Sequence, residues 1–277
     1  MPQTTRFAPS PTGYLHLGHA LAAVTAWRRA REAGGRFLLR LEDIDTARCR
    51  PEFADAVLDD IAWLGLDWDG AVRVQSAHLA EYRAALAALT ERGLLYPCFC
   101  TRTDIAREIA AAGAAPHGPD GPLYPGTCRA LSAGERTARM AAGTPYAWRL
   151  DMARALDTVT APLAFEEEGE GLVACDPAQF GDVVLGRKGV PASYHLCVTH
   201  DDARQGVTLV TRAIDLKPAT HLHRLVQALF GWPTPRYAHH RLLADACGRR
   251  LAKRDHAATL RDLRGRGASA AEILARL

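Results

Sequence analysis

The fold is decided by residues 5–19, which read TRFAPSPTGYLHLGH. The first four residues suit a short strand. Two prolines and a glycine then break the chain before Gly18, near which we expect a helix with apolar side chains at spacing three. After Gly34-Gly35, residues 37–41 read FLLRL, which is typical of a buried strand. The order strand, helix, strand favours a parallel sheet in an α/β fold.

Apolar periodicities elsewhere in the sequence predict more elements. Residues 53–64 and 79–89 each place their apolar side chains on one face and predict helices. Strands are expected at 182–185 and 206–210, so that the alternating strand and helix pattern resumes there, followed by a helix around 222–229. Residues 269–277 begin with capping-box spacing and predict a final amphipathic helix.

The character of the chain changes between residues 97 and 180. Residues 113–126 are rich in glycine, alanine and proline, and residues 166–170 form an acidic run that we expect to be a turn. We therefore predict an inserted module inside an α/β domain. The predicted segments are residues 1–96 and 181–235 for the two halves of a Rossmann-type catalytic domain, 97–180 for the inserted module, and 236–277 for a C-terminal segment with a basic loop and helices.

Composition excludes several classes of protein. The 277 residues are long enough to bury about three quarters of the unfolded chain's surface, so stability needs no disulfide or metal. With 48% hydrophobic and 23% charged residues, the chain matches neither collagen-like nor disordered proteins, and no apolar run reaches the roughly 18 residues of a membrane span. The net charge of +3 neither requires nor forbids RNA. The seven cysteines cannot all pair, and the N-terminus lacks secretory-signal features, so we expect a cytoplasmic protein.

His16 and His19 lie between the first predicted strand and helix. Parallel sheets bind ligands at this position, and the free backbone N–H groups of a helix N-terminus favour anions. Imidazoles there can donate to phosphate oxygens, and Gly18 would let a flat purine or a phosphate lie against the backbone. Two histidines at this spacing are by themselves more often ordinary surface residues, so a phosphate site depends on the surrounding sequence.

Five motifs occur in a fixed order over more than 200 residues. They are RFAPSPTG at 6–13, RLEDID at 40–45, DVVLGR at 182–187, PASYHL at 191–196 and GVTLVTRAIDL at 206–216. Together with residues 16–19 they resemble the glutamyl subgroup of class I aminoacyl-tRNA synthetases, whose nucleotide signature has the form His-x-Gly-His. The resemblance implies a Rossmann-type catalytic domain that uses ATP with Mg²⁺ to form glutamyl-adenylate.

The resemblance also implies which residues act. Catalytic roles fall to His16, His19 and Lys253, and ATP binding to His16, Gly18, His19 and Lys253. Glutamate binding falls to Arg6, Phe7, Ala8, Pro9, Ser10, Glu42, Tyr194 and Arg212. The chemistry agrees, because arginine forks match the two carboxylates of glutamate and an acidic side chain matches its ammonium group.

The family ends its catalytic domain with a lysine loop, Lys-x-Ser-Lys. Here the matching residues are Arg250, Leu251, Ala252, Lys253 and Arg254, so the first lysine and the serine are replaced. Positive charge is kept, a hydroxyl donor is lost, and Lys253 remains able to follow the charge on a leaving pyrophosphate. Taken alone, such a run is more often a solvated basic turn.

Three cysteines cluster in the sequence of the predicted insertion. Cys98, Cys100 and Cys128 supply three of the four ligands of a tetrahedral Zn²⁺. The resemblance implies Tyr124 as the fourth, whereas His117 is the chemically more usual ligand in the same loop. The alternative is free thiols in a structural turn. Bound zinc would hold the shape of the module, since the expected reaction needs no Lewis acid there.

Only 23 residues follow Arg254 in this 277-residue sequence, whereas ordinary members of the family continue into anticodon-reading domains. The chain therefore resembles a shortened paralogue that attaches glutamate to the queuosine base at the wobble position of tRNA(Asp). Expected partners are L-glutamate, ATP and the queuosine-bearing anticodon stem-loop of tRNA(Asp), with no membrane and no oligomer. Two alternatives remain: a truncated synthetase that charges the terminal adenosine of tRNA, and a non-catalytic RNA-binding module.

Overall fold

The computed structural model describes residues 2–111, 117–190, 192–243 and 258–277. The predicted strand, helix, strand unit is confirmed as β1 (Thr4–Phe7), α1 (Leu17–Glu32) and β2 (Arg36–Leu41). The two strands are parallel, with Arg6 opposite Leu38. Helix α1 begins at Leu17 because the His16 side chain caps it by accepting from the backbone N–H of Gly18.

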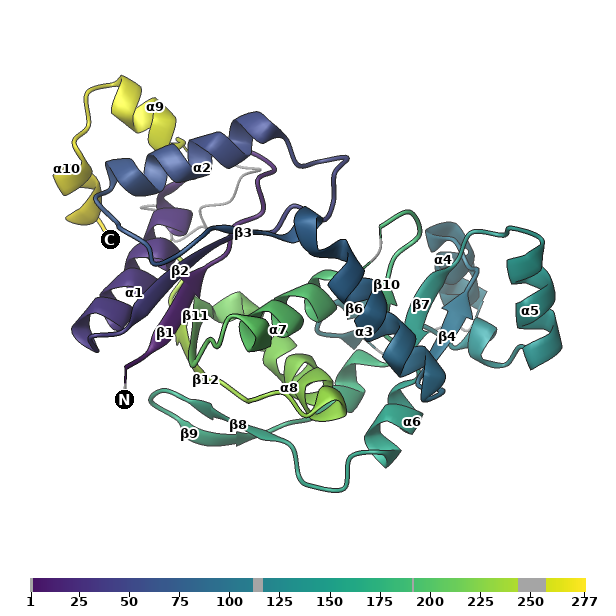
Figure 1. Ribbon diagram of the computed structural model, residues 1–277. Coiled ribbons are helices and arrows are strands. Elements are labelled where there is room, and N and C mark those ends of the chain that lie inside the picture. The colour runs from purple at the N-terminus through teal and green to yellow at the C-terminus, as the bar shows by residue number, and fades with distance from the viewer. Residues whose placement is uncertain (1, 112–116, 191, 244–257) are drawn as a thin grey trace.

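Two parallel half-sheets meet beside β1. On one side β2 pairs with β3 (Arg73–Val74), and in the other half β11 (Leu209–Ala213) pairs with β12 (Arg236–His240), all in parallel. The Thr208 N–H donates to the Thr4 carbonyl at 2.9 Å, which holds the start of β11 next to β1 (Figure 1). Strand order reverses at this junction, which is the place where open α/β sheets bind ligands.

The helices expected outside the insertion are present. They are α2 (Pro51–Trp63), α3 (Leu79–Glu91), α8 (Ala219–Phe230) and α10 (Ala270–Leu274), together with two that the periodicity did not predict, α7 (Tyr194–Arg204) and α9 (Leu260–Gly265). The Ser269 and Glu272 side chains form the predicted capping box of α10. None of the helices in the described part of the chain combines the length and apolar character that a membrane span requires.

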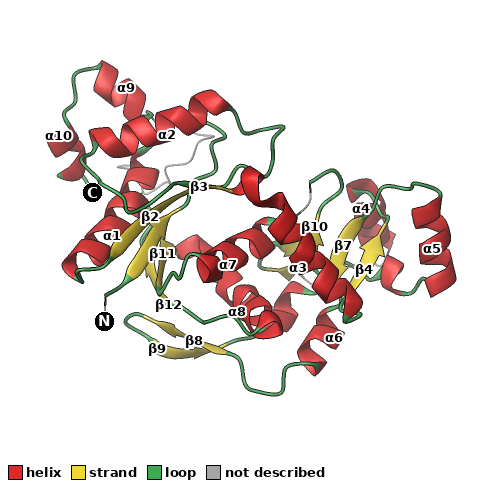
Figure 2. Cartoon of the chain, viewed as in Figure 1, coloured by secondary structure: helices red, strands yellow, loops and turns green. Residues whose placement is uncertain are grey.

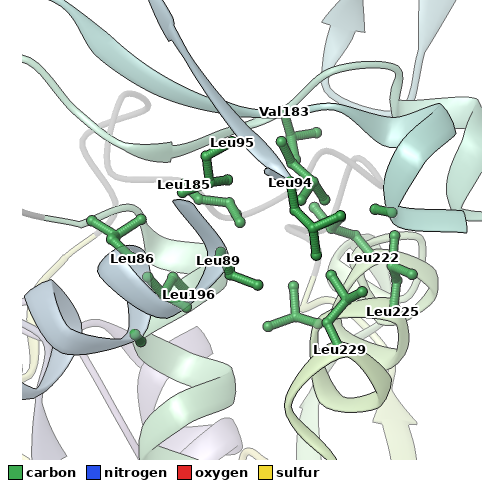
Figure 3. Close-up of a cluster of buried hydrophobic side chains, with 14 of the residues drawn as sticks. Leu86, Leu89, Leu94, Leu95, Val183, Leu185, Leu196, Leu222, Leu225 and Leu229 are labelled. Carbon is green, nitrogen blue, oxygen red and sulfur yellow. The ribbon is translucent and has the colours of Figure 1, made fainter. Parts of the chain in front are cut away.

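The two largest apolar clusters in the described part of the chain support different parts of the molecule. One packs leucines of α3, α7 and α8 against Leu94 and Leu185, as Figure 3 shows. The other packs α1 and α2 against β1 and β2, and it also buries Leu260 and Ile273 completely. The C-terminal helices α9 and α10 thus lie on the same body as α1 and α2 (Figure 1).

A separate antiparallel sheet forms the lobe drawn on the right of Figure 2. Its strands are β4 (Leu95–Cys98), β7 (Ala147–Leu150) and β10 (Val184–Gly186), with β7 in the middle. The lobe also carries α4 (Arg102–Ala111), α5 (Ala133–Ala141), α6 (Met152–Asp157) and a small hairpin of β5 (His117–Gly118) and β6 (Gly121–Pro122). The prediction that residues 182–185 resume the parallel pattern is wrong, because β10 pairs antiparallel with β7.

The acidic run 166–170 is only partly a turn. Glu166 and Glu167 end β8 (Ala164–Glu167), which continues through the turn into β9 (Gly171–Ala174). Strand β8 pairs in parallel with β12, so this part of the predicted insertion joins the second half-sheet. The acidic run predicts a solvated turn, but Glu167 is buried, and the backbone N–H and the imidazole of His239 satisfy its carboxylate.

Candidate functional site

A cavity of about 530 Å³ opens where four parallel strands end. Phe7, Glu42, Ala213 and His240 lie at or just after the carboxyl ends of β1, β2, β11 and β12, and all line it. The cavity brings together every predicted glutamate and nucleotide residue in the described part of the chain: Arg6, Phe7, Ala8, Pro9, Ser10, His16, Gly18, His19, Glu42, Tyr194 and Arg212. The lysine-loop residues 250–254, with Lys253, lie outside the described residues.

The two histidines of the nucleotide signature have defined protonation. The Nδ1 atom of His16 accepts from the Gly18 N–H at 3.1 Å, and the Nδ1 atom of His19 accepts from the His16 N–H at 3.2 Å. A neutral imidazole whose Nδ1 accepts carries its proton on Nε2. Both rings, 3.9 Å apart, therefore have an Nε2–H donor, as a phosphate site requires.

The structure gives a reason for glycine at position 18 that the sequence did not show. A Cβ atom there would lie 2.9 Å from Cε1 of His16, closer than side chains tolerate. The missing side chain thus lets the His16 ring fold over the first turn of α1 and cap it.

Arg6 is held by ion pairs from the other half of the chain. Its Nε and Nη2 atoms donate to the two oxygens of Asp202 at 2.9 and 3.4 Å, and Nη1 donates to the Thr211 carbonyl at 3.1 Å. Asp202 also accepts from Arg40 at 2.9 Å, and Arg40 reaches Glu42 at 3.3 Å. The pairs link β1 and β2 to α7 and fix the orientation of Arg6 and Glu42.

The carboxyl group of Glu42 is buried in this cluster. Burial raises its pKa to about 7, against the opposing pull of the Arg40 and Arg6 charges. An ammonium group placed beside Glu42 would stabilise the carboxylate form. The side chain is thus poised to respond to a positively charged ligand near neutral pH.

Sequence reasoning missed Arg40 and Asp202. Arg40 lies inside the motif RLEDID and is completely buried. The alternation of a strand assigns its side chain to one face of the sheet but does not indicate an ion-pair partner. Asp202 lies in α7, where nothing in the local pattern indicates that it reaches β1. Its neighbour Asp201 accepts from Arg73, Gln75 and Tyr82 and ties α7 to β3 and α3 as well.

Arg212 has a different environment. Its Nε donates to Nε2 of His239 at 3.1 Å, Nη1 to Nδ1 of His223 at 3.1 Å, and Nη2 to Oγ1 of Thr220 at 2.6 Å. All three acceptors belong to β12 or α8. Tyr194, whose ring lies 5.8 Å from that of His223, is half-buried at the same wall of the cavity, and desolvation raises the pKa of its hydroxyl.

The predicted metal ligands form a cluster in the antiparallel lobe. The Sγ atoms of Cys98, Cys100 and Cys128 all lie within 4.8 Å of one another. The Tyr124 hydroxyl oxygen lies 3.5 Å from the Cys100 sulfur and accepts from the Cys128 N–H at 2.9 Å. His117 does not join the group among the described residues, so the geometry favours Tyr124 as the fourth ligand.

The thiols differ in how readily they ionise. Burial raises the pKa of Cys100 to about 12. Burial also opposes ionisation of Cys128, yet hydrogen bonds from Tyr124 and the Phe99 N–H lower its pKa. Three sulfurs and a phenol oxygen are donors that suit Zn²⁺, whose charge would favour the thiolate forms.

Comparison with known proteins gives this pocket a context. Residues 3–276 match the model of the family described as tRNA synthetases class I (E and Q), catalytic domain. A protein of Rhodobacter capsulatus named glutamyl-Q tRNA(Asp) synthetase is 50% identical over 277 residues, which cover 97% of each chain. Its namesake from Nocardia farcinica is 46% identical over 98% of this chain and 82% of its own.

The chain belongs to the class I (E and Q) tRNA synthetase family. It is therefore a ligase, and the resemblance read from the ordered motifs is confirmed. A crystal structure of a glutamate tRNA ligase from Elizabethkingia meningosepticum in complex with its amino acid has a TM-score of 0.73 and 27% identity to it. The match covers 92% of this synthetase chain and 52% of that ligase, so the chain spans about half the length of the ligase.

Proposed function

We propose that this synthetase activates L-glutamate with ATP in the absence of tRNA and transfers the glutamyl group to the queuosine base at the wobble position of tRNA(Asp). The observation that carries the proposal is the single cavity in which two arginines, Glu42 and the histidine signature meet. The names of the Rhodobacter and Nocardia relatives support the choice of acceptor.

In this proposal the amino acid binds between the two half-sheets. Arg6 and Arg212 donate to the carboxylates of glutamate, and Glu42 accepts from its ammonium group. Hydrogen bonds with described residues use three of the five N–H groups of each arginine, which leaves donors for a substrate. Ser10 and Tyr194 add hydroxyl groups, and residues 7–9 form the wall beside β1.

Activation needs positioning and charge stabilisation and no protein nucleophile. An oxygen of the α-carboxylate attacks the α-phosphorus of ATP, the bond from that phosphorus to the bridging oxygen breaks, and pyrophosphate leaves. His16 and His19 donate through Nε2–H to phosphate oxygens at the N-terminus of α1, and Gly18 keeps the backbone open to the nucleotide. Mg²⁺ bound with ATP would neutralise phosphate charge, and Lys253 is proposed to follow the leaving pyrophosphate.

Transfer then consumes the adenylate. A hydroxyl group of the queuosine cyclopentene diol attacks the glutamyl carbonyl, the carbonyl-to-phosphate bond breaks, AMP leaves with the electron pair, and the hydroxyl proton is released to water. The diol is chemically similar to the terminal ribose of tRNA, so the same attack by a hydroxyl group on the glutamyl carbonyl is proposed for it.

We propose further that Cys98, Cys100, Tyr124 and Cys128 hold a structural Zn²⁺. The metal would supply a cross-link between the end of β4 and the loop that follows β6. The cluster belongs to the antiparallel lobe and contributes no residue to the cavity, so its role is to maintain the lobe.

Two assays test the proposal. Pyrophosphate exchange into ATP should depend on L-glutamate and occur without tRNA, and its absence would favour a non-catalytic RNA-binding module. Transfer of labelled glutamate should succeed with an isolated tRNA(Asp) anticodon stem-loop that carries queuosine. The matched control is the same stem-loop with guanosine at that position. Since neither stem-loop has a terminal adenosine, labelling of intact tRNA(Glu) alone would instead identify a truncated glutamyl-tRNA synthetase.

A further inference from the structure

The cations of the cavity differ in how their charges are balanced. Arg6 and Arg40 both pair with Asp202, and Arg40 also pairs with Glu42, at distances of 2.9–3.3 Å. With Glu42 ionised, these four groups carry no net charge. Arg212 forms no ion pair with a carboxylate in the part of the chain that the structure describes, although its guanidinium is buried.

The acceptors around Arg212 are held neutral by the hydrogen-bond pattern itself. A guanidinium can only donate, so Nδ1 of His223 and Nε2 of His239 must both be unprotonated. The remaining proton of His223 sits on Nε2 and points to Nδ1 of His195 at 3.1 Å. His195 in turn has its Nε2 3.4 Å from a carboxylate oxygen of Asp120, on the turn between β5 and β6.

His239 is also a neutral acceptor for Arg212. Nδ1 of His239 carries the proton and donates to Glu167 at 2.7 Å. The carboxylate of Glu167 therefore reaches Arg212 only through an imidazole ring. Burial, followed by the charge of Arg212, lowers the pKa of both histidines, that of His239 to about 3, which agrees with the neutral forms that the hydrogen bonds require.

We infer that His223 and His239 are positioning residues that select an anionic amino acid, because they orient Arg212 without neutralising its charge. This inference rests on the proposed function. L-Glutamate carries two carboxylates and one ammonium group, a net charge of −1, and one of its carboxylates would give Arg212 the anionic partner that it lacks among the described residues. Glutamine has the same shape without net charge and would leave Arg212 buried and unpaired, which is costly.

A matched pair of substitutions tests the role of His223. The side-chain oxygen of asparagine or aspartate can take the place of Nδ1, so His223→Asn keeps a neutral acceptor for Arg212 and His223→Asp supplies an anionic one. Both shorten the side chain and remove the imidazole Nε2–H that faces His195. We expect His223→Asp to raise the KM for L-glutamate about tenfold or more, because the substrate carboxylate loses a charge-assisted hydrogen bond to Arg212. In His223→Asn the KM for L-glutamate should stay within about threefold of that of the unchanged protein.

The readouts separate this role from a structural one. The KM for ATP should stay unchanged in both variants. In each variant kcat should fall less than kcat/KM for glutamate does. The preference for glutamate over glutamine should be reduced only in His223→Asp. Equal glutamate KM values in the two variants would overturn the inference. If the unchanged protein showed no glutamate-dependent pyrophosphate exchange, the proposed function would be contradicted. Calorimetric titration of both variants with L-glutamate would then still test the inference.

A second pair protects against a variant that does not fold. Thr220 accepts from Nη2 at the other end of the same guanidinium. Thr220→Asn and Thr220→Asp should reproduce the contrast, with the higher glutamate KM or dissociation constant in the aspartate variant. The same value in both would count against charge as the deciding property.

Discussion

The ligand cavity and the cysteine cluster are organised in opposite ways. In the cavity, Arg6 and Asp202 are separated by 196 positions in sequence and pair through two hydrogen bonds. In the cluster, Cys98, Cys100 and Cys128 fall within one short segment and touch mainly each other, with the sulfurs of Cys100 and Cys128 3.4 Å apart. The protein's own opposite charges shape the cavity, whereas the cluster collects like groups that would repel one another once ionised.

The two regions obtain their rigid geometry from different sources. A network of buried ion pairs keeps its geometry whether or not a substrate is bound, at the cost of removing charges from water. A group of thiols reaches a comparable rigidity only when a cation holds the ionised forms. We therefore expect the cavity to fail when one of its own charges is removed and the cluster to fail when its metal is removed.

Asp202→Asn should have the largest effect, because it leaves Arg6 and Arg40 buried without their shared partner. We expect a loss of about 3–5 kcal/mol in the free energy of unfolding, measured by urea denaturation. Asp55→Asn, at an exposed position of α2, is the control and should change stability little. A loss below about 1 kcal/mol in Asp202→Asn would show that the network does not organise the cavity.

Removal of zinc should act on the other region. If free zinc stands about a hundredfold above its dissociation constant, a chelator should lower the free energy of unfolding by about 2.7 kcal/mol. Cys128→Ser should lower it without chelator and then respond little to chelation, whereas Cys175→Ser, outside the cluster, should respond like the unchanged protein. Glutamate-dependent exchange should persist at temperatures where the lobe stays folded. Loss of glutamate-dependent exchange before any unfolding would show that the cavity also depends on the metal.

Much of the cavity could be predicted because many of its lining residues are neighbours in the sequence. Residues 6–10 and 16–19 are continuous with the first strand and helix, so local patterns and the family motifs place them together. Arg40, Asp202, His223 and His239 were not predicted, since each meets its partner only after the helices α7 and α8 and the two half-sheets have assembled. Their signal in the sequence is merely a polar residue in an otherwise buried element.

The sheet assignments failed for a related reason. A run such as residues 182–185 predicts a strand, but it says nothing about which partner the strand takes. Strand β10 pairs with β7, where Gly186 fits closely against Trp148, and β8 leaves the predicted insertion to join β12. The cysteine cluster was easier to predict, because its ligands lie close together in sequence.

Glu42→Gln sharpens the contrast inside the cavity. The substitution keeps the shape and an acceptor oxygen but removes the charge that would pair with the substrate ammonium. We expect the KM for L-glutamate in pyrophosphate exchange to rise about 10- to 100-fold, with the KM for ATP unchanged. Glu52→Gln, at an exposed position of α2, is the control. A KM within about twofold of the unchanged protein would remove Glu42 from the amino-acid site.

The smallest expected effect is a pH dependence. Because burial raises the pKa of Glu42 to about 7, the group loses its charge as the pH falls through that value. The kcat/KM for glutamate reports ionisation of the free enzyme, so it should fall about tenfold between pH 8 and pH 6.

Stability should change with the opposite sign. The folded protein binds the Glu42 proton more tightly than the unfolded chain, so this group favours folding at low pH, and its contribution is lost as the pH rises from about 4.5 through about 7. In Glu42→Gln, the part of both pH dependences that comes from this carboxyl group should disappear. If the fall in kcat/KM below pH 7 persisted in that variant, another group, and not the buried charge network, would control the pH response of the cavity.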